Sequence, residues 1–174
     1  MKTAARSLVE TVYRFRASGQ TDIQLRNREK AAALRKSDMF VYAVRLRVFS
    51  NSAYVLIVPW RRGKTVDDHE GLYQADVIQQ MVNRIYFKSK KDDGIILREK
   101  YSPFPVVAFA LILAAVECAI DEWTDGSFTK VPFTEEKYSP IYRHHLRELR
   151  QYEVASDDLQ VVTQLCQWMY EDGR

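Results

Sequence analysis

The chain has 174 residues, of which 47% are hydrophobic and 28% are charged, with only six glycines and five prolines. This length and composition suit one globular domain with an apolar core, and they exclude collagen-like, low-complexity and largely disordered chains. Two cysteines are too few for a secreted scaffold held by disulfides, so we expect Cys118 and Cys166 to be free, buried thiols. The first fifteen residues include Glu10 and lack the apolar core of a signal peptide, which favours an intracellular location in the cytoplasm or nucleus.

The net charge of +3 hides an uneven distribution of charge along the chain. Residues 1–64 hold fourteen Lys/Arg and four Asp/Glu, a balance of +10, whereas residues 65–174 hold twelve against nineteen, a balance of −7. Such a split is typical of a protein with a nucleic-acid or other acidic partner. It also arises when two halves of one domain pack together and neutralise each other.

Two helices are predicted at the N-terminus. Apolar residues recur with helical spacing over residues 5–15, and Ser18-Gly19 then ends that helix. Residues 24–36 are rich in strong helix formers and carry many charges.

Residues 39–60 allow two interpretations. A stripe spaced alternately by three and four residues favours a helix of six turns. The stripe consists of Met39, Tyr42, Leu46, Phe49, Ala53, Leu56 and Trp60. The runs VYAVRLRVF and AYVLIVPW, separated by Ser-Asn-Ser, fit a β-hairpin instead because they are rich in β-branched and aromatic residues. We prefer the helix because the stripe is longer than the strand-like alternation.

The next elements surround the most apolar segment. Residues 61–70 form a polar loop, residues 72–87 an amphipathic helix, and residues 88–94 a turn or exposed loop. Residues 106–120 then form a helix that is apolar all round, with Glu117 as its single charge, so it is expected at the centre of the domain. Its fifteen residues are fewer than the roughly 18–20 that a membrane span needs.

Two further helices complete the chain. Thr134 followed by Glu135 and Glu136 predicts a helix start, and Ser156 followed by two aspartates repeats the signal. Apolar faces follow each start, namely Tyr138, Tyr142, Leu146, Leu149 and Tyr152, then Val162, Leu165, Cys166 and Met169. The predicted fold is all-α, a single compact domain of about seven helices over residues 1–174, with α+β and a hairpin at 40–60 as the alternative.

Motifs for catalysis, cofactors or metals are missing, and we expect a non-enzymatic protein. The sequence contains no G-x-S-x-G, no phosphate-binding glycine loop and no C-x-x-C. Adjacent His144 and His145 diverge by about 100° on a helix, so one is expected to pack and the other to be solvated rather than both binding one ion. Asp121 and Glu122 stand at a helix C-terminus, where the helix dipole disfavours them, so we expect a basic residue of the first half to pair with them.

Two binding functions remain. Ten Tyr and three Trp exceed what a small core needs and favour a protein partner or self-association, with Trp60, Tyr73 and Trp168 as candidates for an exposed patch. The alternative is nucleic-acid (DNA) binding through the basic first half, which would contact phosphates more than bases. The candidate contacts are Arg26, Arg28, Lys30, Arg35, Lys36, Arg61, Arg62 and Lys64. No membrane partner is expected.

From Pro105 onward the sequence resembles an uncharacterised all-helical domain family that is abundant in mushroom-forming fungi. The family has an alanine-rich helix entered from a proline and ending in Glu-Trp, followed by a Gly, a Phe and a helix with two Tyr and a His-Leu. The matching positions are Pro105, Ala110, Glu122, Trp123, Gly126, Phe133, Tyr138, Tyr142, His145, Leu146 and Leu149. The resemblance implies a helical fold and a fungal origin, and it implies no activity or cofactor.

Overall fold

The computed structural model describes residues 1–42, 44–48, 55–59 and 71–174, and all structural statements below concern these residues. Within them the chain forms eight α-helices, two 3-10 helices and one two-stranded sheet. In order these are α1 (Lys2–Val12), α2 (Thr21–Arg35), η1 (Lys36–Val41), β1 (Val44–Val48), β2 (Val55–Pro59), α3 (Asp76–Tyr86), α4 (Asp93–Ile96), α5 (Arg98–Tyr101), α6 (Val106–Asp121), α7 (Glu135–Ala155), η3 (Asp157–Leu159) and α8 (Val161–Gly173).

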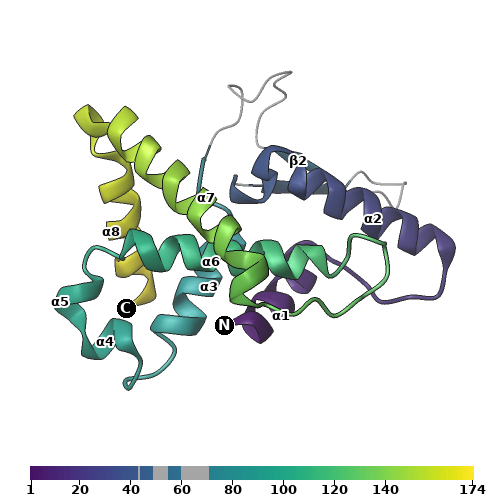
Figure 1. Ribbon diagram of the computed structural model, residues 1–174, viewed down its shortest axis with the longest axis horizontal. Coiled ribbons are helices and arrows are strands. Elements are labelled where there is room, and N and C mark those ends of the chain that lie inside the picture. The colour runs from purple at the N-terminus through teal and green to yellow at the C-terminus, as the bar shows by residue number, and fades with distance from the viewer. Residues whose placement is uncertain (43, 49–54, 60–70) are drawn as a thin grey trace.

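Helix α6 is the centre of the domain, as its uniform apolar character predicts. Eleven of its residues are buried, on every side of the helix. Figure 1 shows α6 in the middle of the molecule with α7 crossing it, and α1, α2 and α3 also contact it. A helix that buries its whole circumference needs neighbours on all sides, so the amphipathic helices around it each contribute one apolar face.

Helix α7 begins where the sequence indicates. Thr134 is its N-cap, and the Thr134 hydroxyl accepts a hydrogen bond from the Lys137 backbone N–H. Tyr138, His145 and Leu149 form its buried side against the core. The opposite side of this 21-residue helix faces solvent, and its C-terminal end lies beside α8 (Figure 1).

Our preferred prediction of a helix over residues 39–60 is wrong, and the alternative prediction of a β-hairpin is correct. Residues Lys36–Val41 form a 3-10 turn, after which β1 and β2 pair antiparallel with Leu46 opposite Ile57. Both strands are rich in valine. Because β-branched side chains lose rotamer freedom in a helix but not in a strand, these residues favour the hairpin. Apart from this hairpin every described element is helical, so the predicted all-α fold class is confirmed. The predicted loop at 61–70 lies outside the described residues.

Two features around α3 also differ from the prediction. Helix α3 starts at Asp76 rather than Leu72, because Leu72 forms a β-bridge with Tyr42 and Tyr73 has a φ of 62°. The segment after α3 contains the short helices α4 and α5, which the sequence did not indicate.

Ser156 does not cap α8. Its hydroxyl instead donates to the Tyr152 carbonyl at 2.6 Å, and α8 begins after Gln160, which has a φ of 52°. Cys118 and Cys166 are free and buried, as expected. Among the described helices, none combines the length and the apolar character required to cross a membrane.

Candidate functional site

Glu122, at the C-terminal end of α6, is fully buried and paired with the first helix. The Arg6 guanidinium donates to both Glu122 carboxylate oxygens at 2.8 and 2.7 Å, and the Lys2 ammonium lies 3.0 Å from Oε1. The backbone N–H of Val131 donates to the same oxygen at 3.2 Å. Burial acts to raise the pKa of Glu122, but the hydrogen bonds from Arg6 and the nearby charge of Lys2 outweigh it and hold this pKa below its ordinary value. The expected pairing of this carboxylate with the basic first half is confirmed.

A second buried network joins α2, α6 and α7. Arg35 donates to Glu117 and lies 3.2 Å from Asp121 Oδ1, while His145 Nε2 lies 2.7 Å from Glu117 Oε2. The Tyr138 hydroxyl donates to Asp121 Oδ2 at 2.8 Å. Burial acts to raise the pKa of Glu117, but the hydrogen bond from His145 and the charge of Arg35 more than compensate and lower it. Every charged group in this cluster has a partner of opposite charge or a hydrogen bond, as a structural network requires.

Several residues that carry the family resemblance hold the same region together. Trp123 is buried and stacks on Phe15, with 5.1 Å between ring centroids. Gly126 has a φ of 86°, and a Cβ there would lie 2.1 Å from the Gln24 carbonyl oxygen. Phe133 contacts the Tyr138 ring at 5.1 Å, Tyr142 packs against the core, and Pro105 is the N-cap of α6. These positions therefore have structural roles in the described fold.

Some residues of the predicted basic surface are engaged within the fold, and others are exposed. Arg35 belongs to the buried network, and the Lys30 ammonium donates to the Arg14 carbonyl at 2.9 Å above the Phe15 ring. Burial lowers the pKa of Lys30 to about 8. Arg26 lies 3.7 Å from Asp22, whereas Arg28 and Lys36 are exposed. Arg61, Arg62 and Lys64 lie outside the described residues.

The candidate aromatic patch is also not assembled as expected. Tyr73 is only 6% exposed and belongs to the core, whereas Trp168 on α8 is 57% exposed. Trp60 lies outside the described residues. Of the two candidates that the structure describes, Trp168 is therefore the exposed one.

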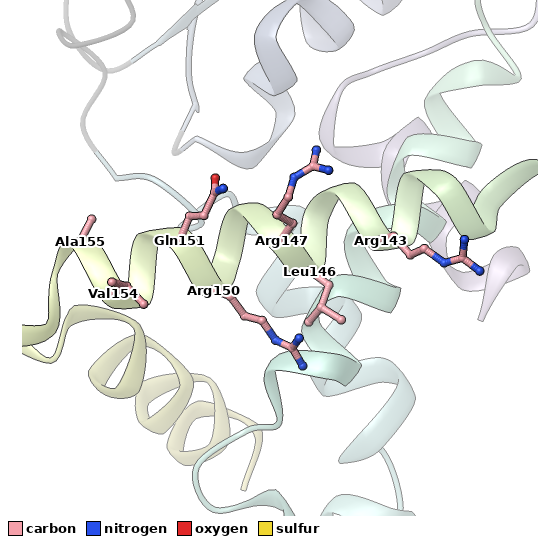
Figure 2. A pocket seen from close by; sticks show the side chains of 7 residues that line it. All are labelled: Arg143, Leu146, Arg147, Arg150, Gln151, Val154 and Ala155. Carbon is pink, nitrogen blue, oxygen red and sulfur yellow. The ribbon is translucent and has the colours of Figure 1, made fainter.

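The outer face of α7 forms a shallow groove of about 580 Å³, which we call the α7 groove. Arg143, Arg147 and Arg150 follow one another at intervals of four and three residues, so they form a stripe along the helix. The lining residues are Arg143, Leu146, Arg147, Arg150, Gln151, Val154 and Ala155 (Figure 2). The sequence contains this stripe within residues 65–174, whose overall charge balance is acidic.

The two adjacent histidines differ in environment, as expected. His145 is buried, with its ring edge against Phe40, whereas His144 is half-exposed and its Nε2 lies 3.1 Å from Asp38 Oδ2. One potential ligand atom from each of Asp38, His144 and His145 lies within 4.8 Å of the others. Asp38, from a distant part of the chain, therefore brings a third potential ligand atom close to both histidines.

Comparison with known proteins identifies a family. No curated protein and no solved structure is significantly similar to the chain. A family model described as a domain of unknown function, DUF6532, matches residues 1–152, which include α1 to α6 and nearly all of α7. The chain therefore belongs to the DUF6532 domain family.

Proposed function

We propose that this domain is a non-enzymatic, intracellular binding module that docks a protein partner in the α7 groove. The observation that carries this proposal is the combination of three arginines with an aliphatic floor on one face of one helix. The partner is an acidic amphipathic helix, since its carboxylates would match the arginines and its apolar side chains would cover the floor.

The groove has the composition of a recognition surface. Arg143 and Arg150 have no acidic partner within the described part of the chain, and the Arg147 guanidinium lies 3.6 Å from its neighbour Glu148 and 3.1 Å from His144 Nδ1. Val154 is 78% exposed at the end of the stripe. Arginine is enriched at binding hot spots because its planar guanidinium binds carboxylates through two hydrogen bonds.

Nucleic-acid binding through the basic first half is the second candidate. Arg28 and Lys36 remain exposed and support it, but Arg35 and Lys30 are engaged within the fold. Fewer cations are then left to release counterions from a phosphate backbone. The resemblance to domains of mushroom-forming fungi supports a fungal origin as a further part of the proposal.

The test uses a fluorescein-labelled acidic amphipathic helix of about twenty residues, with Glu on one face and Leu on the other. Fluorescence anisotropy is expected to report saturable binding by the whole chain. The triple variant Arg143→Glu, Arg147→Glu and Arg150→Glu should weaken binding at least tenfold, because it replaces attraction with repulsion.

The matched control is Lys88→Glu, Lys90→Glu and Lys91→Glu, which makes the same charge change on an exposed turn after α3. If both triple variants lost peptide binding equally, the interaction would depend only on net charge, and the proposal would be contradicted. A peptide of the same composition in scrambled order separates helix docking from charge alone. A labelled DNA duplex that binds better than the peptide, and loses binding in Arg28→Glu with Lys36→Glu, would favour the second candidate.

A further inference from the structure

We propose that Asp38, His144 and His145 form a binding site for a divalent zinc-type metal ion between η1 and α7. One ligand atom from each residue lies within 4.8 Å of the other two, and Asp38 Oδ2 is 3.1 Å from His144 Nε2. Ligand atoms about 2.0–2.1 Å from a tetrahedral zinc are about 3.3 Å apart, so one pair already has the required spacing. Two imidazoles and one carboxylate are a donor set that zinc accepts, with water in the fourth position.

The buried network orients His145 for this role. His145 Nε2 is hydrogen-bonded to Glu117 Oε2 at 2.7 Å, which leaves Nδ1 as the nitrogen with a free lone pair for a metal. Metal-binding histidines commonly hold their second ring nitrogen against a carboxylate in this way. The ring is also fixed by burial and by Phe40, whose ring meets it edge-on at 5.8 Å.

His144 can bind the metal through Nε2 if its Nδ1 changes its hydrogen-bond partner. Its Nδ1 lies 3.1 Å from the Arg147 guanidinium and 3.9 Å from Glu148 Oε1. A metal on Nε2 requires the ring proton on Nδ1, where it can donate to Glu148 but not to the Arg147 donor. Arg147 is exposed and can turn away, so metal binding replaces Arg147 with Glu148 as the partner of His144.

The turn before Phe40 brings Asp38 to the two histidines. Ser37 and Asp38 both have left-handed backbone angles, with φ of 52° at each residue. Phe40, two residues on, is buried and anchors the turn to the core. The site therefore joins η1 to α7 across 106 residues of sequence, and an ion there would link these two elements.

This proposal reverses the sequence-based expectation of no metal site, and the proposed site shares one neighbouring residue, Arg147, with the α7 groove. The role it assigns to the ion is structural. An ion that binds the folded chain and not the unfolded chain stabilises the fold in proportion to its occupancy.

The test measures zinc binding by the whole chain after treatment with a chelator, using a competing chromophoric indicator at pH 7. One equivalent of Zn²⁺ is expected to bind and to raise the melting temperature. Asp38→Asn and His144→Gln should each weaken zinc affinity at least tenfold and abolish the rise in melting temperature. Both residues are partly exposed, so helicity by circular dichroism should stay unchanged.

Two further variants make the test specific. Arg147→Gln removes the donor that competes for His144 Nδ1 and is expected to raise zinc affinity several-fold. His69→Gln, which changes the third histidine of the chain, is expected to bind zinc like the wild type. The proposal is overturned if the wild type binds zinc no more tightly than Asp38→Asn with His144→Gln, or if His69→Gln loses the same affinity.

Discussion

Glu117 and His145 share a buried hydrogen bond of 2.7 Å between α6 and α7, and Arg35 from α2 completes the pair from the other side of the carboxylate. Glu117 is the single charged residue of the central helix α6 before its last residue, Asp121. Its partners come from positions 82 residues before it and 28 residues after it. Three helices are therefore fixed around one carboxylate.

Replacing Glu117 with Ala is expected to cost about 1–3 kcal/mol of unfolding free energy, because it leaves the buried His145 without its hydrogen-bond partner and removes one of the two carboxylates that Arg35 contacts. Urea denaturation followed by circular dichroism measures this. Glu153→Ala, an exposed position of α7, should change the value by about 0.5 kcal/mol or less. A loss of similar size in both variants would show that the buried network does not stabilise the fold.

Acid is expected to destabilise the domain through Glu117 and Glu122. Both carboxyls have a pKa below the ordinary value of 4.5 in the folded chain, so the unfolded chain binds more protons. The stabilisation is complete above that value and is lost as the pH falls through the lower folded pKa values. Unfolding free energies measured from pH 7 down to pH 3 should fall steeply for the wild type. The double variant Glu117→Gln and Glu122→Gln should show a shallower slope, and an unchanged slope would refute this assignment.

Truncating Trp123 to Ala is expected to cost about 3–5 kcal/mol, because the ring is buried and stacks on Phe15. The midpoint of urea denaturation gives the loss. The control is Trp168→Ala, since that ring is largely exposed on α8 and should contribute little to the unfolding free energy. If the Trp168 variant were the less stable of the two, the packing described here would be wrong.

Gly126→Ala is expected to lower the unfolding free energy of the domain by about 1–3 kcal/mol. The backbone there has a φ of 86°, and a Cβ would lie 2.1 Å from the Gln24 carbonyl oxygen. This oxygen belongs to the backbone, so it cannot easily move away from the added methyl group. Gly19→Ala is the matched control, because a Cβ at Gly19 would meet nothing within 4 Å. Thermal melts of the two variants compare the positions directly, and equal melting temperatures would contradict the close approach at Gly126.

Much of the fold follows from local patterns that the sequence displays. The apolar run at 106–120 predicts the central helix, and Thr134 with two glutamates predicts the start of α7. These predictions succeed because a cap and an all-apolar circumference depend on near neighbours in the chain. The charge split also indicates the pairing of Glu122 and Asp121 with the first half, although it does not say which basic residues take part.

Local patterns fail where a tertiary contact decides between two allowed structures. Residues 39–60 fit a helical stripe and a hairpin, and only strand pairing such as Leu46 with Ile57 resolves the choice. Ser156 has the composition of a helix cap, but its hydroxyl bonds backward to Tyr152 and α8 begins later.

The candidate sites divide in the same way. The arginine stripe of the α7 groove is periodic, so the sequence contains it, but only the structure places it on the outer face of α7. In the cluster of Asp38, His144 and His145, the sequence shows the adjacent histidines but not their third member, because Asp38 is 106 residues from His144 and meets it through the turn before Phe40. The sequence alone thus determined the helices, their apolar faces and the sign of the charges, which are properties of neighbouring residues. Tertiary packing decided the hairpin, the network around Glu117 and the approach of Asp38 to the histidines, because each requires contacts between segments that are distant in the chain.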